Sequence, residues 1–455
     1  MTRALTFDEF DRFLTSLACG QRVAVGVSGG ADSLALALLL AQWQRQEAGR
    51  EVHVLTVDHG LRAEAAHEAE QVQQWMRAAG LSHKTLVWEG QKPQGAIQAA
   101  ARSARYDLMV DYCLEHNIRD LLVAHHEDDQ AETFLMRLQR GSGVDGLAAM
   151  APSTPLVTRG AEVRLLRPFL SVPRARLVRF MEAGEHPWIE DPSNTDEQYL
   201  RVQVRQALDV LDGLGLGRER LVTTARHMAR ARGALESAVS QFLAQFCVRH
   251  KWGAVRVELA PFRALPDEIS LRVLARLFQA VAGASYAPRF AKLEALWKDL
   301  DEGTIEGART LGGVQLFPDP EGFWLCREIS AATGTFALPP QGSGAWDNRF
   351  VVSWEGDEAD PLSAGVDVRA LGLEAMRALK DRFCDELLGL PRPLFQALAC
   401  CPAFFRDDRL VGLPEGVLHR EECSLETNLL DLTDKVQCVP IWDGELDFIS
   451  FYSSS

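Results

Sequence analysis

The chain has 455 residues, of which 47% are hydrophobic and 24% charged, and its formal net charge is −15. This length predicts two or three domains, and the composition is that of a folded soluble protein. The sequence contains no apolar run of membrane-spanning length and its first residues lack a signal-peptide profile, so we expect neither a membrane protein nor a secreted one.

The negative charge is distributed unevenly along the chain. From Ala331 onward there are 10 Lys and Arg residues against 21 Asp and Glu residues, whereas the first 330 residues hold 38 against 42. A net charge of −15 argues against a nucleic-acid partner. Because most of the excess acid lies near the C-terminus, net charge does not decide the partner, and local basic patches could bind one.

Short apolar runs alternate with helical patterns in the first part of the chain. The predicted strands are residues 22–27, 52–57, 84–87 and 121–124, and the predicted helices are 34–46, 65–79 and 96–116. This alternation predicts an α/β fold with a parallel sheet covered on both faces. Ligands of such sheets lie beyond the carboxyl ends of the strands, which directs attention to residues 28–33, 58–62 and 125–132.

The rest of the chain is less regular. A loop rich in Pro, Ser and Thr (151–158) closes the α/β unit, and an arginine-rich stretch follows, with helical character after about Val202. A Gly- and Pro-rich segment (333–344) predicts a linker. We therefore expect a catalytic domain, a helical or mixed middle domain and a small β-rich C-terminal domain, spanning residues 1–210, 211–332 and 345–455.

The first strand runs directly into Ser28-Gly29-Gly30-Ala31-Asp32-Ser33, which opens a helix. Adjacent glycines bring backbone N–H groups close to a ligand, and the helix dipole favours a phosphate. Ser28 and Ser33 add hydroxyl donors, and Asp32 would act through Mg²⁺. The loop lacks the Lys of a P-loop and the glycine spacing of a dinucleotide site. It resembles the pyrophosphate loop of N-type ATP pyrophosphatases; a glycine turn that binds nothing is the alternative.

A second polar segment, residues 125–133, follows a strand and opens a helix. Asp129 and Glu132 share a helix face there and could hold an ammonium group or Mg²⁺. The zinc-protease motif fails, because Gln130 stands where the second His belongs. Acidic residues also favour helix N-termini, which accounts for one or two of these side chains. The formal G-x-G-x-x-G of residues 141–146 follows a helix, so we expect a loop that ends this helix.

The ordered motifs resemble those of the tRNA(Ile)-lysidine synthetase family over residues 22–210. After the pyrophosphate loop come residues 57–62, 101–106, 125–133 with Arg137, 141–143, 166–169, 188–194, 199–201 and Arg205. A weaker similarity to the family's C-terminal domain covers residues 390–414. Many members carry Asn where this chain has Val202, which puts in doubt any contact that depends on that amide.

This resemblance implies a ligase that uses ATP and Mg²⁺ to modify the wobble cytidine of tRNA(Ile) with a CAU anticodon. The family adenylates the C2 oxygen of that base and releases pyrophosphate, and free L-lysine then displaces AMP to give lysidine. The product pairs with A instead of G, so the codon changes from AUG to AUA and the amino acid from Met to Ile. A cytoplasmic location is expected, because the nine cysteines are scattered, without a C-x-x-C pair, and are interpreted as reduced thiols.

The resemblance also assigns roles to individual residues. The ATP phosphates would be bound by Ser28, Gly29, Gly30, Ala31, Asp32 and Ser33, together with Arg102 and Arg105. Asp32 and Asp128 would hold Mg²⁺, and Asp129 and Glu132 would bind lysine. A carboxylate or His125 would accept the proton of the amine. Contacts to tRNA or phosphate are expected from Arg62, Arg201 and Arg205.

Three other functions are alternative interpretations of these motifs. A tRNA-thiolating enzyme would share the adenylation chemistry, but such enzymes usually need a C-x-x-C pair or an iron–sulfur site, which this sequence lacks. A glutamine-dependent synthetase would need a glutaminase unit with a Cys nucleophile motif, and none is evident. A non-catalytic RNA-binding protein would have no use for the acidic residues of the two motifs.

Overall fold

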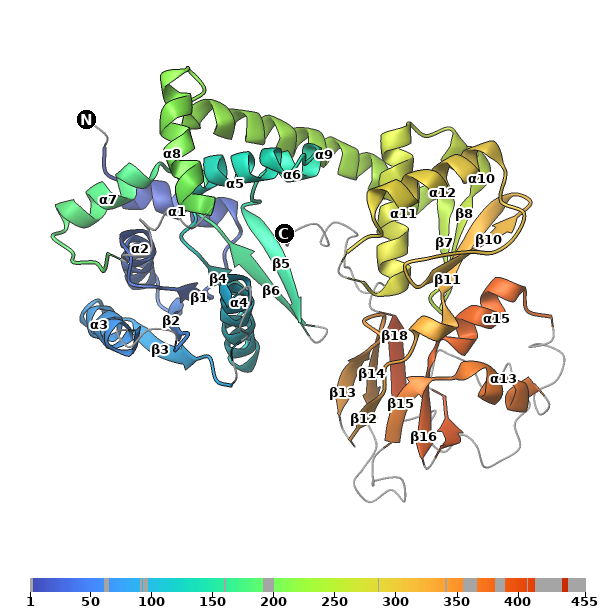
Figure 1. The fold of residues 1–455 in the computed structure, drawn as a ribbon. Helices are drawn as coiled ribbons and strands as arrows, with labels where there is room; N and C mark the ends of the chain where they lie inside the picture. The colour runs from blue at the N-terminus through green and yellow to red at the C-terminus, as the bar shows by residue number, and fades with distance from the viewer. Residues whose placement is uncertain are drawn as a thin grey trace. The chain divides into compact units, whose positions relative to one another are not determined.

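The computed structural model describes residues 3–60, 65–90, 92, 97–158, 161–190, 200–284, 286–339, 342–354, 366–380, 389–406, 408–413 and 436–440. The chain divides into two compact units, one extending to Ala234 and the other covering Leu235–Phe451. Figure 1 shows both units with their elements labelled. Within the described residues, no helix has the length and apolarity needed to cross a membrane.

The first unit is built on a six-stranded sheet with the order β3-β2-β1-β4-β6-β5. Its strands are β1 (Arg22–Gly26), β2 (Glu51–Asp58), β3 (Ser82–Val87), β4 (Asp120–Leu122), β5 (Ser153–Thr158) and β6 (Ala161–Leu166). Neighbouring strands from β3 to β6 pair in parallel, and β5 pairs antiparallel to β6 at the edge. The carboxyl ends of the parallel strands therefore meet at one edge of the sheet.

Helices cover both faces of this sheet, as the apolar strands predict. The helices are α1 (Phe7–Ser16), α2 (Ala31–Gln46), α3 (Ala65–Ala78), α4 (Ile97–Glu115) and α7 (Arg174–Ala183). One apolar core joins α1, α2, α3 and α7 to the sheet and includes Phe10, Leu36 and Met181. A second core lies between the sheet and α4 and includes Met109 and Cys113. The α/β fold class is confirmed.

The predicted strands and helices of the sheet region are present with ends shifted by a few residues, but the predicted loop at 151–158 is wrong. Residues Ser153–Thr158 form β5 instead. Thr154 and Leu156 pair with Leu165 and Val163 of β6. Pro155 is compatible with this strand because β5 lies at the sheet edge, where a missing N–H donor leaves no ladder bond unmade.

A smaller helical layer completes the first unit. It consists of α5 (Glu127–Gln139), α6 (Val144–Leu147), α8 (Leu200–Gly213) and the first part of α9 (Arg218–Phe246). Ala131 of α5, Leu208 of α8 and Val222 of α9 share one buried cluster. As the sequence predicts, the glycine segment ends α5: this helix stops at Gln139, and Gly141 has φ of 72°.

The second unit begins with a five-stranded antiparallel sheet of order β7-β8-β11-β10-β9. Its elements are β7 (Cys247–Arg249), β8 (Val255–Glu258), α10 (Leu259–Arg263), α11 (Asp267–Ala282), α12 (Phe290–Glu302), β9 (Arg309–Leu311), β10 (Val314–Asp319) and β11 (Gly322–Arg327). Phe278 of α11 and Leu293 of α12 pack with Phe323 of β11 in one core.

The remaining described elements form two further antiparallel sheets, of order β12-β15-β16-β17 and β13-β14-β18. The elements are η2 (Ile329–Ala331), β12 (Phe336–Leu338), β13 (Ser343–Trp346), β14 (Phe350–Trp354), β15 (Val366–Ala370), α13 (Gly372–Lys380), α15 (Arg392–Ala399), β16 (Pro402–Arg406), β17 (Arg409–Gly412) and β18 (Val436–Pro440). This confirms the β-rich character expected of the C-terminal region.

The prediction of a linker at 333–344 is wrong for part of that segment. Phe336–Leu338 form β12, which pairs with β15, and Leu338 is fully buried. Its Gly and Pro residues flank a short strand rather than separate two bodies. The three predicted domain ranges, which differ from the two-unit division, stay predictions.

Candidate active site

The loop between β1 and α2 turns sharply at the carboxyl edge of the sheet. Gly29 has φ of 90°, a conformation that side chains with a Cβ atom rarely adopt. A Cβ atom at Gly29 would also lie 2.7 Å from Cδ1 of Ile189, whose N–H donates to Gly29 O (2.9 Å). Both the backbone conformation and this close approach require glycine.

Serine hydroxyls hold the loop in shape and leave its backbone donors available. Ser33 Oγ donates to Gly30 O (3.0 Å) and accepts from the Ser28 N–H (3.2 Å). Gly30 is the N-cap of α2, and among the described residues no side chain caps this helix. The first N–H groups of α2, which begins with the buried Ala31, therefore point to a place where an anion would be stabilised.

A reciprocal cap starts α5 beside this loop. The His126 N–H donates to Asp129 Oδ2 (3.0 Å), and the Asp129 N–H donates to His126 Nδ1 (3.4 Å). Both side chains are buried. Burial raises the pKa of Asp129, but His126, Arg201 and His125 outweigh it and hold that pKa below its usual range. Asp129 thus has a structural role at the helix start in addition to any role with a substrate.

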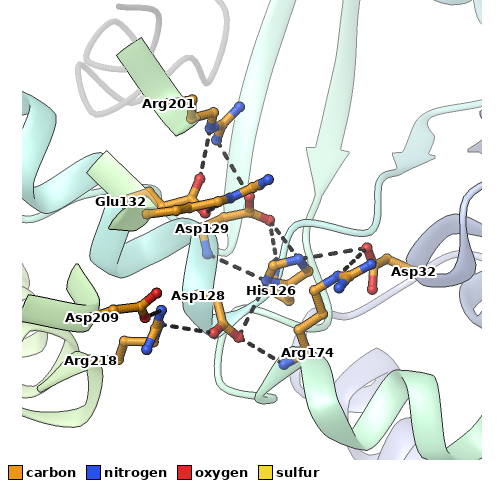
Figure 2. A network of polar contacts seen from close by, with 10 residues as sticks. Asp32, His126, Asp128, Asp129, Glu132, Arg174, Arg201, Asp209 and Arg218 are labelled. Atoms are coloured by element: carbon orange, nitrogen blue, oxygen red, sulfur yellow. Dashed lines mark hydrogen bonds and ion pairs between the residues drawn. The ribbon is translucent and has the colours of Figure 1, made fainter. Parts of the chain in front are cut away.

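Asp32 has one carboxylate oxygen paired and one unpaired. Figure 2 shows Arg174 and His126 directed at it: Arg174 Nε donates to Asp32 Oδ2 (3.1 Å), and His126 Nε2 lies 3.7 Å from the same oxygen. Oδ1 is buried without a hydrogen-bond partner in the described part of the chain. A buried carboxylate oxygen with no donor is unfavourable unless a cation or another donor binds it.

Asp128 lies between two further elements. It accepts a hydrogen bond from the backbone N–H of Arg174 (2.9 Å), and its Oδ1 lies 3.5 Å from Arg218 Nε. Arg218 also donates to Asp209 of α8 (2.7 Å). Asp32 and Asp128 thus approach the same residue, Arg174, one through its side chain and the other through its backbone (Figure 2).

Glu132 is 2% exposed and bound by two arginines of α8. Arg201 Nε donates to Oε2 (2.9 Å) and Arg205 Nε donates to Oε1 (2.5 Å). Arg201 also approaches Asp129 Oδ1 at 3.5 Å. Val202, next to Arg201, is buried, so this position contributes packing in this chain.

A cationic group surrounds His125 at the end of β4. Burial lowers the pKa of the His125 imidazole to about 3, with Arg167, Arg102 and Arg201 acting in the same direction against Asp129. Burial likewise lowers the pKa of Arg167 to about 10. His125 Nδ1 and the Nε atoms of Arg105 and Arg167 are buried without hydrogen-bond partners among the described residues. Unpaired donors and positive charge at this point suit an anionic ligand.

The structure brings most of the predicted site residues to one edge of the sheet. One network joins the phosphate loop, the carboxylates on α5 and the arginines on α8. Arg102 and Arg105 lie on α4, and their guanidinium groups are 5.4 and 5.9 Å from the ring of Tyr106. Arg201 and Arg205 contact the acidic residues rather than standing apart from them. Arg62, Tyr199 and residues 191–194 lie outside the described residues.

Three residues of the network carried no predicted role. His126, rather than His125, contacts the acidic residues, and Arg174 and Arg218 contact Asp32 and Asp128. His126 could have been found from its position directly before an acidic helix start. Arg174 and Arg218 belong to the arginine-rich stretch, but no spacing distinguishes them there.

The residues present fit a magnesium ion that is held jointly with phosphates. Among the described residues, no group of three or more His, Cys, Asp or Glu side chains is arranged to hold a metal. Mg²⁺ in ATP-using sites commonly takes one or two carboxylates, with phosphates and water as its remaining ligands. The unpaired Oδ1 of Asp32 and the nearby Asp128 meet that requirement.

Several known proteins are similar to this chain. A family model described as a PP-loop domain matches residues 6–210. The tRNA(Ile)-lysidine synthase of Ruegeria pomeroyi is 38% identical over 87% of this chain and 88% of its own length. That of Wolbachia pipientis wMel is 37% identical over 92% of each chain. Among solved structures, the U34-tRNA thiolase NcsA from Methanococcus maripaludis aligns at 18% identity with a TM-score of 0.40, over 50% of this chain and 78% of its own.

Identity above one third across nearly the whole length of these relatives, with a PP-loop domain at the described site, establishes the relationship. This chain belongs to the tRNA(Ile)-lysidine synthase family.

Proposed function

We propose that this protein ligates free L-lysine to C2 of the wobble cytidine of tRNA(Ile) with a CAU anticodon, at the expense of ATP. The observation that carries this proposal is the continuity of the polar network. Contacts run from Asp32 in the phosphate loop through His126 to Asp129, and from there through Arg201 to Glu132. A nucleotide at one end and an amine at the other would then share one site.

In the first half-reaction, the cytosine C2 oxygen attacks the α-phosphorus of ATP, and the bond from that phosphorus to the bridging oxygen breaks to release pyrophosphate. The N–H groups at the start of α2 and the hydroxyls of Ser28 and Ser33 would hold the phosphates. Asp32 and Asp128 would hold Mg²⁺, which supplies charge neutralisation on the phosphate oxygens when bound. Adenylation is needed because the C2 oxygen is otherwise a poor leaving group.

In the second half-reaction, the lysine Nε forms a bond to C2, and the bond from C2 to the adenylated oxygen breaks to release AMP. Asp129 would bind the ε-amino group of lysine, because its contact with Arg201 (3.5 Å) is longer than the contacts of Glu132 with Arg201 and Arg205. Glu132 already accepts from two guanidinium groups, so its part would be to orient Arg201 and Arg205 beside the substrate.

The attacking amine must be neutral and must lose a proton during the reaction. His125 is neutral at pH 7, since its pKa is lowered to about 3 by burial and the neighbouring arginines. A base with so low a pKa holds a proton weakly. For His125 to accept the proton, the negative charge of bound substrates must therefore raise its pKa. Asp129 is the alternative acceptor.

The RNA would be bound by basic residues that the acidic network does not use. Arg140, Arg220 and Arg230 are exposed, and their guanidinium groups make no hydrogen bond or ion pair with any described residue. They lie at the end of α5 and on α9, within a chain that is acidic overall. We propose that these arginines contact phosphates of the tRNA and that the predicted middle and C-terminal domains make further contacts to it.

The test is ATP-dependent incorporation of labelled lysine into a CAU-anticodon isoleucine tRNA transcript. Wild type should incorporate lysine only with ATP, and Asp32→Ala should lose incorporation. Asp8→Ala, which removes an exposed carboxylate from α1, is the matched control and should behave as wild type. Release of pyrophosphate without lysine attachment would refute lysine as the nucleophile, and no ATP turnover with any tRNA would refute an enzymatic role.

A further inference from the structure

We propose that the guanidinium of Arg174 exchanges partners during the catalytic cycle. In the ligand-free protein it neutralises Asp32. Once a cation binds Asp32, the guanidinium binds the phosphates of ATP and then the departing pyrophosphate. This inference rests on the proposed function and extends it to a residue for which neither the sequence motifs nor the comparisons indicate a role. It assigns to α7 a part in nucleotide binding.

The backbone of Arg174 is fixed at the site. Arg174 is the first residue of α7, and its N–H donates to Asp128 Oδ2 (2.9 Å). Two residues before it, Val172 O accepts from the N–H of Glu127, the first residue of α5 (3.0 Å). These two hydrogen bonds join the start of α7 to the start of α5. The Cα atom of Arg174 is therefore held beside the phosphate loop whatever its side chain does.

The side chain of Arg174 is far less constrained. It is 52% exposed, and its guanidinium contact within the described residues is with Asp32 Oδ2, at 3.1 Å. Arg176, two residues further along α7, shows the opposite case. Its side chain is 20% exposed, and its guanidinium donates to Glu9 and to the backbone oxygens of Arg3 and Ala4. Arg174 can reorient at little cost, whereas Arg176 is locked to the N-terminal segment.

Arg174 does not satisfy both carboxylate oxygens of Asp32. One guanidinium reaches Oδ2 while Oδ1 stays buried and without a donor. A cation bound to Asp32 would satisfy Oδ1, but it would also repel a guanidinium held a few ångströms away. The nearest new partner for that guanidinium would be an anion at the start of α2, where Asp32 itself lies in the first turn. Guanidinium groups bind phosphate oxygens through two parallel hydrogen bonds.

Arg218 explains why the exchange is assigned to Arg174 alone. Arg218 approaches Asp128 at 3.5 Å, but it also donates to Asp209 at 2.7 Å. If a cation bound Asp128, Arg218 would keep Asp209, its closer carboxylate partner. Arg174 has no second carboxylate for its guanidinium among the described residues (Figure 2).

The experiment measures two ligands of opposite charge on purified full-length protein without tRNA or lysine. Mn²⁺, a spectroscopic substitute for Mg²⁺, is titrated alone by electron paramagnetic resonance, and pyrophosphate is titrated by calorimetry, once in EDTA and once in saturating Mg²⁺. For Arg174→Ala we expect Mn²⁺ to bind roughly three- to tenfold tighter, because Asp32 loses its competing cation. In saturating Mg²⁺, Arg174→Ala should bind pyrophosphate about ten- to a hundredfold more weakly than wild type does, because a charge-assisted contact is lost.

Matched variants separate this role from a structural one. Arg179→Ala removes an exposed guanidinium from the same helix, where it pairs with Glu182, and should change neither affinity. In EDTA, Asp32→Asn should strengthen pyrophosphate binding, because it releases Arg174 without a cation. This gain should shrink in the double variant with Arg174→Ala.

Weaker binding of both Mn²⁺ and pyrophosphate by Arg174→Ala would show a structural role and overturn the proposal. Affinities equal to those of Arg179→Ala would also overturn it, as would strictly additive effects in the double variant. If wild type binds pyrophosphate and Arg174→Ala binds it equally well, the proposed function stands and only the role of Arg174 is refuted. If wild type binds neither ATP nor pyrophosphate, both proposals fall.

Discussion

The carboxylates of the site differ in how completely the protein satisfies them. Glu132 is nearly fully buried and accepts from two arginines, whereas Asp32 keeps one buried oxygen without a donor. Burying a charge is favourable only when it is paired and hydrogen-bonded. Glu132 therefore acts as a fixed part of the scaffold, and Asp32 is the carboxylate whose unpaired oxygen a bound ligand would satisfy.

Gly29 offers a test of the loop with a matched control. Gly29→Ala combines a φ of 90° with a Cβ contact of 2.7 Å to Ile189, whereas Gly80→Ala meets a φ of 79° with nothing within 4 Å. Both variants should lose about 1 kcal/mol of unfolding free energy through backbone strain. Gly29→Ala should lose more and should bind pyrophosphate at least tenfold more weakly, measured by urea unfolding and calorimetry. Equal pyrophosphate affinity in the two variants would contradict the loop's role.

His125 predicts a specific dependence of stability on pH. Burial lowers its pKa to about 3 in the folded chain, against about 6.5 when unfolded. Between these values the unfolded chain binds a proton that the folded chain does not, so the free energy of unfolding falls as the pH is lowered from about 6.5 toward 3. This contribution is absent above pH 6.5.

In His125→Asn the loss of stability between pH 6.5 and about 4 should be shallower than in wild type, as measured by urea unfolding at a series of pH values. His227→Asn replaces an exposed histidine of α9 and should follow the wild-type curve. Parallel curves for wild type and His125→Asn would show that the imidazole is not held neutral by its surroundings.

At the scale of elements, ion pairs as well as apolar contacts hold α8 on α5. The shared apolar cluster of α5, α8 and α9 has few buried members, among them Ala131 and Leu208. Beside it, Arg201 and Arg205 of α8 bind Glu132 of α5. The ion pairs orient the helix that also carries the proposed substrate arginines, so stability and binding depend on the same contacts.

Glu132→Gln should therefore lower the free energy of unfolding by about 1–3 kcal/mol. A buried pair that loses one partner costs about 3–5 kcal/mol, and the figure is reduced here because water reaches the arginines, which are 39% and 41% exposed. Asp209→Asn breaks the pair with Arg218, in which the carboxylate is 71% exposed, and should cost less than about 0.5 kcal/mol. Thermal and urea unfolding measure both, and similar losses would argue against a special role for Glu132.

At the scale of the whole molecule, an acidic chain must bind RNA through local charge. The formal charge is −15, and the excess acid is concentrated after Ala331. Within the first unit, many arginines are bound by carboxylates, whereas no described carboxylate binds Arg140 or Arg230. Burial and the neighbouring Arg232 and Arg140 lower the pKa of Arg137, which shows that positive charge gathers at the end of α5.

Binding of tRNA should consequently weaken with salt through these arginines. Arg140→Ala and Arg230→Ala should each reduce the slope of log K against log salt concentration by about one, as expected for the loss of one phosphate contact. Arg12→Ala, an exposed arginine on α1, is the control and should leave the slope unchanged. Filter binding over a range of salt concentrations measures the slope, and unchanged slopes in both α5 and α9 variants would place the RNA elsewhere.

Local pattern was sufficient to predict the sheet and the edge of it at which the candidate residues lie. Apolar strands such as 22–27 bury both faces, and their alternation with helices predicts that their carboxyl ends meet at one edge. The segments after β1 and β4 were identified for that reason, and the structure places Asp32, Asp128 and Asp129 there. β5 was missed because Pro155 indicates a loop, and its position at the sheet edge is not visible in the sequence.

The family, the α/β fold and the segments that form the candidate site could be predicted from the sequence alone, because these depend on periodicity and on ordered motifs. The tertiary structure alone decided which charges pair. Arg174 lies 142 residues from Asp32, and Arg205 lies 73 residues from Glu132. Contacts at such separations depend on how α7 and α8 pack, and an arginine in sequence looks the same whether it faces RNA, phosphate or a buried carboxylate.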